Sequence, residues 1–306
     1  MNVTDVSKMV QLPLSVKVLL SVLPCLLLLY VNSIMVFVLL RKPFLLECSR
    51  YILFGHLLLT DSLQLLLTLL LYLFALTAVR MVTCVCVVLT QLTAVTVKLS
   101  PINLAAMSLE RYVAICFPLR HASITTPRVT AVAIAVMWTV ASLESFTQLF
   151  LFFSLDEEGL AAQRFCNANT MFQLQVCLTL NRAFTILNFV FVTIIISYTY
   201  VAIMFSVKRP PSGAYKARNE LRTVLLHAFQ LSLYLISTLF NMINSSELLS
   251  FNPAIAIHVE YIVFLCLIIF PKCLSPLIYG LRDPAIRHVF KCYITFGCKS
   301  TVRPHP

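Results

Sequence analysis

The chain is poor in charged residues and in glycine. Asp, Glu, Lys and Arg make up only 11% of its 306 residues, and only 5 residues are Gly. Soluble domains are roughly a quarter charged, so a water-soluble fold is excluded. The sequence has no phosphate-binding glycine loop, no metal-ligand spacing and no nucleophile motif. We therefore expect neither an enzyme nor a cofactor.

Long apolar runs take the place of the missing charges. Hydrophobic residues form 60% of the chain, and one helix needs about 20 apolar residues to cross a bilayer core of about 30 Å. Seven runs have this length, at 18–40, 51–79, 81–109, 129–155, 183–207, 223–246 and 261–281. The sequence thus predicts an all-α membrane protein, a seven-transmembrane helix bundle forming one domain over 1–306. A short outer turn at 77–83 is expected between the second and third runs.

The basic residues predict the orientation of this bundle. With the N-terminus outside, most of the 23 Lys and Arg residues fall on the cytoplasmic side, as the positive-inside rule requires. Residues 1–12 are then extracellular and lack the features of a cleaved signal, and residues 282–306 form a cytoplasmic tail. The net charge of +11 is explained by this topology, so no nucleic-acid partner is expected.

Two modifications are predicted from local patterns. Asn2 begins an Asn-Val-Thr glycosylation acceptor on the outer side. After the seventh run, residues 283–295 form a short amphipathic helix that is expected to lie on the lipid of the inner leaflet. Cys292 and Cys298 near its end are either palmitoylated or unmodified.

Four charged residues fall inside the apolar runs: Asp61, Lys98, Glu144 and Lys272. Each costs about 2.5–3.5 kcal/mol near a helix centre and therefore requires a partner or a cavity. At about 1.5 Å per helical residue, Asp61 and Lys272 both lie roughly 15 Å from the inner ends of their runs. Lys98 and Glu144 lie deeper, roughly 20–24 Å from those ends. Matching depths predict the pairs Asp61 with Lys272 and Lys98 with Glu144.

The motifs at the inner ends of the runs carry a family resemblance. The third run closes on Glu110-Arg111-Tyr112, and the seventh contains Ser275-Pro276-Leu277-Ile278-Tyr279. Asn32 in the first run and Trp138 in the fourth belong to the same set of motif residues, and His227 lies at the start of the sixth run. Together these residues resemble rhodopsin-like G-protein-coupled receptors of the odorant-receptor branch, most closely the fish-type odorant receptors.

The resemblance implies roles for several residues. Glu110 and Glu220 restrain Arg111 at rest, and Arg111 and Tyr112 then contact a heterotrimeric G protein. Tyr198 and Tyr279 line the route along which the sixth span swings out, and Pro276 kinks the seventh span. Simpler interpretations are a membrane-edge anchor for Arg111 and an interfacial aromatic for Tyr198.

Some positions depart from the family pattern. The sixth run has no Trp and no Pro, Ser275 replaces the usual asparagine, and Glu110 replaces the more usual aspartate. These departures put details of activation in doubt and leave the class unchanged.

The resemblance also implies a disulfide between Cys86 and Cys166. Both lie near the oxidising outer face, as does Cys84, which is the competing partner. Free thiols are the remaining alternative, and Cys177 is either a buried thiol or a partner of Cys84.

Asp61 matches a family aspartate that holds a sodium ion, and Ser100 and Ser275 match two further positions of that site. Lys272 falls on the same wall, so the alternatives are an internal Asp61–Lys272 bridge and a sodium site. Lys98 and Glu144 fall near the floor of the family's ligand cavity. They form either a structural pair or a direct ligand contact.

A small organic ligand, an odorant, is expected inside the bundle because the predicted cavity is mainly apolar. Its expected lining is Thr90, Ala94, Val97, Lys98, Leu178, Arg182, Thr238, Met242, Leu265 and Ile268. Ordinary helix packing is the alternative role for each of them, and Arg182 either binds an acidic ligand or pairs with Glu260.

The sequence therefore predicts a multi-pass plasma-membrane odorant or chemosensory receptor coupled to a G protein. One alternative is a receptor of the same class for a non-odorant endogenous ligand. A transporter is the other, and it would require inverted repeats that the sequence does not show.

Overall fold

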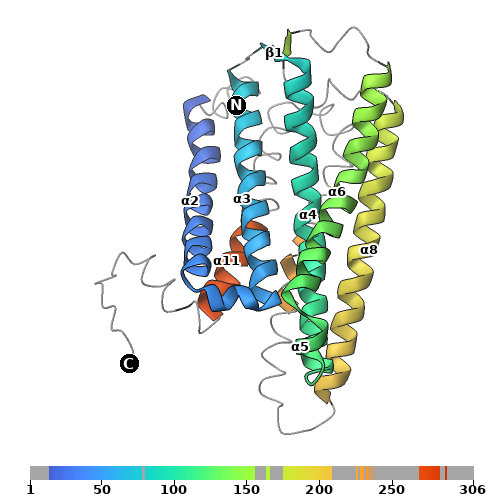
Figure 1. Ribbon diagram of the computed structural model, residues 1–306. Coiled ribbons are helices and arrows are strands. Elements are labelled where there is room, and N and C mark those ends of the chain that lie inside the picture. Colours follow the sequence, from blue (N-terminus) through green and yellow to red (C-terminus); the bar gives the residue numbers. More distant parts are fainter. Residues whose placement is uncertain are drawn as a thin grey trace, which may run out of the picture.

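In the computed structural model, the residues described are 14–77, 80–155, 163–165, 175–208, 225–226, 228–230, 232–233, 236, 269–282 and 287. Five long helices lie side by side: α2 (Leu14–Arg41), α3 (Ser49–Leu76), α4 (Thr83–Cys116), α6 (Pro127–Leu155) and α8 (Gln175–Lys208) (Figure 1). The shorter elements are η1 (Pro43–Glu47), α5 (His121–Ile124), α11 (Phe270–Arg282), β1 (Arg80–Val82) and β2 (Gln163–Phe165).

Each of the five long helices is long and apolar enough to cross a membrane. They coincide with the first five predicted runs, although several of the expected bounds were wrong. Helix α3 ends at Leu76 and not at 79, and residues 81 and 82 belong to β1. Helix α8 begins eight residues before position 183, and α4 continues past Leu109 to Cys116. Because Glu110 and Arg111 are good helix formers, they do not end α4. The helix ends where Phe117, which precedes Pro118, leaves the helical region with φ −130° and ψ 55°.

The last two predicted runs are described only in part. Scattered residues between 225 and 236 represent the sixth run, and α11 covers the end of the seventh. Pro276 lies inside α11, and prolines also lie inside α2 and α4. Membrane helices accept such prolines because neighbouring helices satisfy the freed backbone groups.

The outer turn between α3 and α4 contains a feature that the sequence analysis missed. Strand β1 in this turn pairs antiparallel with β2, with Arg80 opposite Phe165 and Val82 opposite Gln163. Strands of three residues are too short to show a period-two pattern, so the ladder depends on the tertiary approach of the two segments.

Helix α4 is the centre of the bundle and packs against α3, α6 and α8. Phe54, Leu57 and Leu58 of α3 and Leu99 and Leu104 of α4 are completely buried between these helices.

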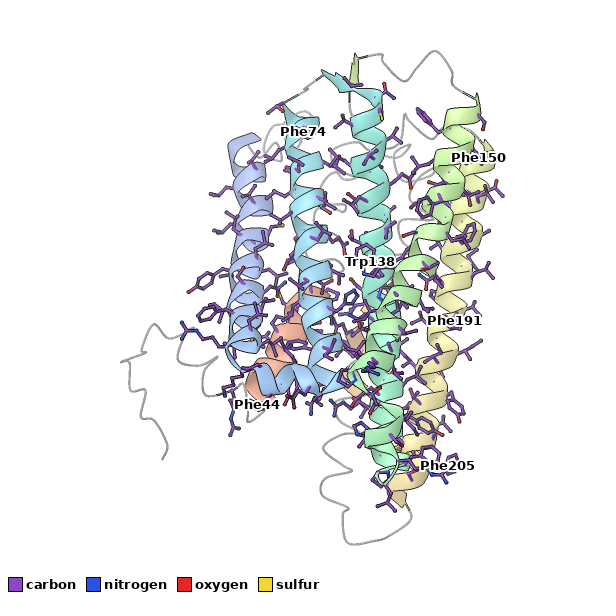
Figure 2. All side chains as sticks on the ribbon, viewed as in Figure 1. Phe44, Phe74, Trp138, Phe150, Phe191 and Phe205 are labelled. Atoms are coloured by element: carbon purple, nitrogen blue, oxygen red, sulfur yellow. The ribbon has the colours of Figure 1, made fainter. Side chains whose placement is uncertain are left out.

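The outward faces of α6 and α8 carry large exposed apolar side chains. Phe150 is 71% exposed, and Phe191 and Phe205 also project away from the bundle (Figure 2). On α6, Val136, Val140 and Leu143 continue this exposed stripe at helical spacing. An apolar outer face around a partly polar interior is the arrangement expected of a bundle in lipid.

Candidate functional site

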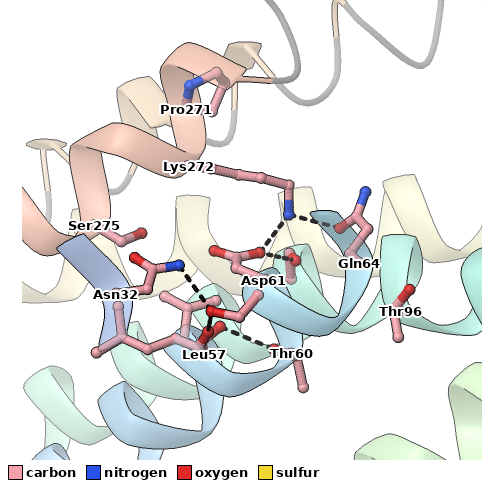
Figure 3. Close-up of polar contacts among 12 residues, drawn as sticks. Asn32, Leu57, Thr60, Asp61, Gln64, Thr96, Pro271, Lys272 and Ser275 are labelled. Atoms are coloured by element: carbon pink, nitrogen blue, oxygen red, sulfur yellow. Dashed lines mark hydrogen bonds and ion pairs between the residues drawn. The ribbon is translucent and has the colours of Figure 1, made fainter. Parts of the chain in front are cut away.

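The most enclosed ion pair in the described part of the bundle joins α3 to α11. Lys272 Nζ lies 2.5 Å from Asp61 Oδ1, and both side chains are completely buried. Lys272 also donates to Gln64 Oε1 at 2.6 Å, and Ser100 Oγ donates to Asp61 Oδ1 at 2.7 Å (Figure 3). A buried charge is tolerated when it is paired and hydrogen-bonded, and both conditions are met at Asp61 Oδ1, whereas Asp61 Oδ2 has no hydrogen-bond partner among the described residues.

The pairing is the one that matching depths predict. Gln64 was missed, although it lies three residues after Asp61 and therefore on the same face of α3. That spacing was the available signal. Asn32 Nδ2 donates to Ser62 Oγ at 3.1 Å, which joins α2 to the same part of α3.

Gln230 of the sixth run was also missed by the sequence analysis. Its Nε2 donates to the backbone oxygen of Pro271 at 2.8 Å and to Ser275 Oγ at 2.7 Å. The side chain is completely buried. An amide in the mainly apolar first half of this run was the signal for an interhelical contact, because such a group needs a partner inside a membrane. Gln230 therefore ties the sixth run to α11 one turn from Lys272.

A second ion pair joins α4 to α6. Lys98 Nζ contacts Glu144 Oε2, as depth predicts, and the two side chains are 13% and 4% exposed. Gln148 Nε2 donates to Glu144 Oε1 at 2.9 Å, and Gln91 Nε2 donates to Gln148 Oε1 at 2.8 Å. Lys98 and Gln148 each donate to one oxygen of Glu144, so the arrangement suits an ionised carboxylate. The two glutamines extend the pair into a polar ladder that the sequence analysis did not predict.

Trp138 lies in a third polar contact, between α3, α4 and α6. Its indole Nε1 donates to His56 Nε2 at 2.9 Å, while Asn103 Nδ2 lies 3.1 Å from His56 Nδ1. Asn103 Nδ2 also donates to the backbone oxygen of Leu53 at 3.1 Å. His56 therefore links the three helices. The sequence analysis did not predict this role.

At the C-terminal end of α4, two basic groups share one carboxylate. Arg111 Nε lies 3.2 Å from Glu110 Oε2, and His121 Nε2 lies 3.2 Å from Glu110 Oε1. Glu110 and Arg111 are buried, with 7% and 4% of their surfaces exposed. Glu220, the second predicted restraint on Arg111, lies outside the described residues.

The next turn of α4 contacts α8. Tyr112 and Tyr198 approach with their hydroxyls 3.3 Å apart and their rings edge to face. One turn further, Cys116 Sγ lies 3.1 Å from Ser206 Oγ. Tyr279 belongs to α11, but its side chain lies outside the described residues.

At the N-terminal end of α4, Cys86 is fully buried and disulfide-bonded, whereas Cys84 is a free thiol. The expected partner, Cys166, follows β2 directly but lies outside the described residues, as does Asn2. The pairing of Cys86 with Cys166 remains a prediction.

The expected ligand cavity is described on one side only. On α4, Thr90 and Ala94 are half-buried and Val97 is 45% exposed. The Thr90 hydroxyl donates to the backbone oxygen of Cys86 at 2.8 Å, and Arg182 is exposed on α8. The side chains outside the described residues are those of Leu178, Thr238, Met242, Leu265 and Ile268. Ligand contact therefore remains a prediction for all ten positions.

Comparison with known proteins agrees with this geometry. Residues 14–279 match the family described as "7 transmembrane receptor (rhodopsin family)". "Odorant receptor 131-2" of Danio rerio is 33% identical over 286 residues, which cover 93% of this chain and 86% of that protein.

Two further relatives match over a shorter length. "Olfactory receptor-like protein COR2" of Gallus gallus is 29% identical over 197 residues, covering 61% of this chain and 60% of that protein. "Olfactory receptor 6C74" of Homo sapiens is 30% identical over 199 residues, with the same two shares. With its apolar spans, buried ion pairs and inner Glu-Arg-Tyr motif, this multi-pass chain belongs to the rhodopsin family of seven-transmembrane receptors, which are not enzymes.

Proposed function

We propose that this receptor binds a small organic odorant within the helix bundle and activates a heterotrimeric G protein. The observation that carries the proposal is the buried contact between Glu110 and Arg111 at the inner end of α4. Relatives named as odorant and olfactory receptors in fish, bird and human support the ligand class.

The proposal includes the full topology. Seven spans, an extracellular N-terminus and an amphipathic helix on the inner leaflet after the seventh span together place the Arg111 end of α4 in the cytoplasm. The five described spans and the match over residues 14–279 support this arrangement. In this topology residues 1–12 are extracellular, residues 282–306 are cytoplasmic, and the chain forms one receptor domain.

Activation follows from the contacts at the inner end. At rest, the Arg111 guanidinium is paired with Glu110, whose Oε2 lies 3.2 Å from Arg111 Nε. When this contact opens, the guanidinium presents a rigid fork of five donors, which suits the carbonyl oxygens at the end of a partner helix. Tyr112 and Tyr198 lie beside it, so movement of α8 against α4 changes the surface that the G protein meets.

Lys272 replaces the sodium ion in this proposal. Its ammonium lies on Asp61 Oδ1, where Ser100 also donates. Because the single negative charge is already balanced, the site does not fit an added cation. Asp61 and Lys272 instead join α3 to α11 next to Pro276, where the missing backbone N–H weakens α11.

The ligand is proposed to lie above the Lys98–Glu144 pair, between α4, α8 and the last two spans. Lys98 is 13% exposed in its side chain, so it stands at the edge of the packed interior. Ten residues, from Thr90 to Ile268, are the proposed lining. A mainly apolar wall with few polar groups suits small volatile molecules.

Arg111→Ala tests this function. Cells that carry cyclic AMP and calcium reporters are exposed to an odorant panel, and the responses are normalised to surface receptor. We expect the variant to reach the surface and to lose its G-protein response. Arg120→Ala is the matched control, because Arg120 is exposed near the same end of α4. A normal response from the Arg111 variant would refute the proposed function.

A further inference from the structure

The inner loop between α4 and α6 is held in one position by a chain of hydroxyl contacts. Thr130 Oγ1 donates to Ser49 Oγ at 2.7 Å, and Ser49 Oγ donates to the backbone oxygen of Thr125 at 2.8 Å. Thr125 in turn donates to the backbone oxygen of His121 through its hydroxyl at 2.7 Å and its N–H at 2.9 Å. The short helix α5 is therefore fastened to the first turns of α3 and α6.

This fixed loop aims one side chain at the buried carboxylate of α4. His121 Nε2 lies 3.2 Å from Glu110 Oε1, while Arg111 Nε lies 3.2 Å from Glu110 Oε2. Each carboxylate oxygen thus faces one basic group. An ionised carboxylate can only accept hydrogen bonds, so His121 is the donor through Nε2.

We propose that His121 is a positioning residue for receptor activation. It holds the Glu110 carboxylate in the orientation that restrains Arg111, and so it couples the inner loop to the arginine contact. The inference rests on the proposed function, because its main readout is G-protein activation. Neither the family motif nor the depth argument points to His121, which lies ten residues beyond Arg111 in the loop.

The charge of the His121 imidazole should make its contact with Glu110 depend on pH. Histidine changes charge between about pH 5 and pH 8, and a charged donor makes roughly twice as strong a bond to a carboxylate. The His121 side chain is 28% exposed, so protons in the cytoplasm can reach it. Acidification is therefore expected to tighten the contact with Glu110 and to lower basal signalling.

The charged side chains at the ends of the helices that meet at this loop are Glu110 and Arg111 on α4, Arg120 before α5, Arg50 at the start of α3 and Arg128 at the start of α6. Glu110 lies within hydrogen-bond distance of His121. Four of the five are arginines, which stay charged throughout this range, so the imidazole carries the expected pH response.

The experiment compares His121→Ala, His121→Gln and the unmodified receptor. Basal nucleotide exchange on a purified G protein is measured on inside-out membranes from about pH 6 to about pH 8, and rates are normalised to receptor amount. Loss of the donor in His121→Ala is expected to raise basal exchange by up to about tenfold. His121→Gln keeps a neutral donor, so basal exchange should stay low and lose its dependence on pH. Ser123→Ala is the matched control on the same loop, because its hydroxyl bonds to the Arg120 oxygen and not to Glu110.

Three outcomes separate the possibilities. Basal exchange in His121→Ala equal to that in Ser123→Ala would overturn the inference, as would an unchanged pH profile in His121→Gln. If neither the unmodified receptor nor any variant activates a G protein, the proposed function fails. In that case thermal unfolding of the purified receptor still tests the contact, because acid should stabilise the unmodified chain relative to His121→Gln. Equal pH dependence of unfolding in the two proteins would then overturn the inference.

Discussion

The two ion pairs inside the bundle differ in what they connect. Asp61 and Lys272 lie 211 residues apart in sequence and join α3 to α11, with both side chains completely buried. Lys98 and Glu144 lie 46 residues apart and join α4 to α6, two helices that also pack extensively through apolar side chains. The first pair is a large part of the polar link between α3 and α11, whereas the second reinforces a contact that exists without it.

The two ion pairs also differ in how completely other groups enclose them. Lys272 donates to a second acceptor, Gln64, and Asp61 accepts from Ser100, so the charges are enclosed by groups from three helices. The Lys98 side chain is 13% exposed, and Glu144 accepts a hydrogen bond from Gln148 one turn further along α6. We infer that the enclosed pair fixes the position of α11, while the ladder fixes the rotation of α6 against α4.

The largest effect is expected from breaking the enclosed pair. Lys272→Met leaves the Asp61 carboxylate buried without a cation, which should cost about 3–5 kcal/mol of unfolding free energy. Asp61→Asn should cause a similar loss, and the double variant should recover part of it. Thermal unfolding and surface yield of all four proteins measure this coupling as a double-mutant cycle. Strictly additive losses would show that the two residues do not depend on one another.

The response to sodium tests whether Lys272 takes the place of a bound cation at Asp61. In the unmodified receptor, replacing sodium with choline should leave thermal stability and basal signalling unchanged, because Lys272 already balances Asp61. In Lys272→Met the carboxylate is free to bind a cation, so sodium should stabilise that variant. A sodium-dependent shift in the unmodified receptor would contradict the proposed replacement.

Breaking the α4–α6 pair should have a smaller effect. In Lys98→Met, Glu144 keeps the hydrogen bond from Gln148, so the loss should fall at the low end for a buried pair, about 3 kcal/mol. Glu144→Gln in the same background should restore surface yield. If Lys98→Met destabilises the receptor more than Lys272→Met does, the distinction between an enclosed and a reinforcing pair is wrong.

Removing the amide that ties the sixth run to α11 is expected to cost still less. Gln230→Leu eliminates two donated hydrogen bonds, about 1–3 kcal/mol, and should raise basal signalling because the sixth run is released from α11. Ser232→Ala is the control, since Ser232 bonds only to the nearby backbone oxygen of Phe229. Equal basal signalling in the two variants would mean that Gln230 does not hold the resting state.

The smallest effect is expected at the end of the ladder. Gln91→Leu removes one donor to Gln148 but also removes Gln91 Oε1, a buried acceptor without a partner in the described part of the chain. These terms oppose each other, so the change in unfolding free energy should stay within about 1 kcal/mol. A much larger loss would show that the ladder acts as one unit with the Lys98–Glu144 pair.

The sequence by itself determined the spans and the depth of each buried charge. Length and apolar composition decide which runs cross a bilayer, and a helical rise of about 1.5 Å per residue converts residue number to depth. That is why the first five runs and both ion pairs were predictable, whereas the Glu110-Arg111 motif was recognised by its family resemblance. These properties belong to single helices and do not depend on their neighbours.

Only the tertiary structure decided which polar neutral groups meet. Gln64, Gln230 and His121 each find their partner because helices are rotated about their axes and an inner loop is folded back onto α3 and α6. The β1–β2 ladder likewise requires two distant segments to approach. A charged residue needs an opposite charge at the same depth, but a neutral amide or imidazole does not. Its partner therefore depends on how the helices pack, which one sequence does not specify.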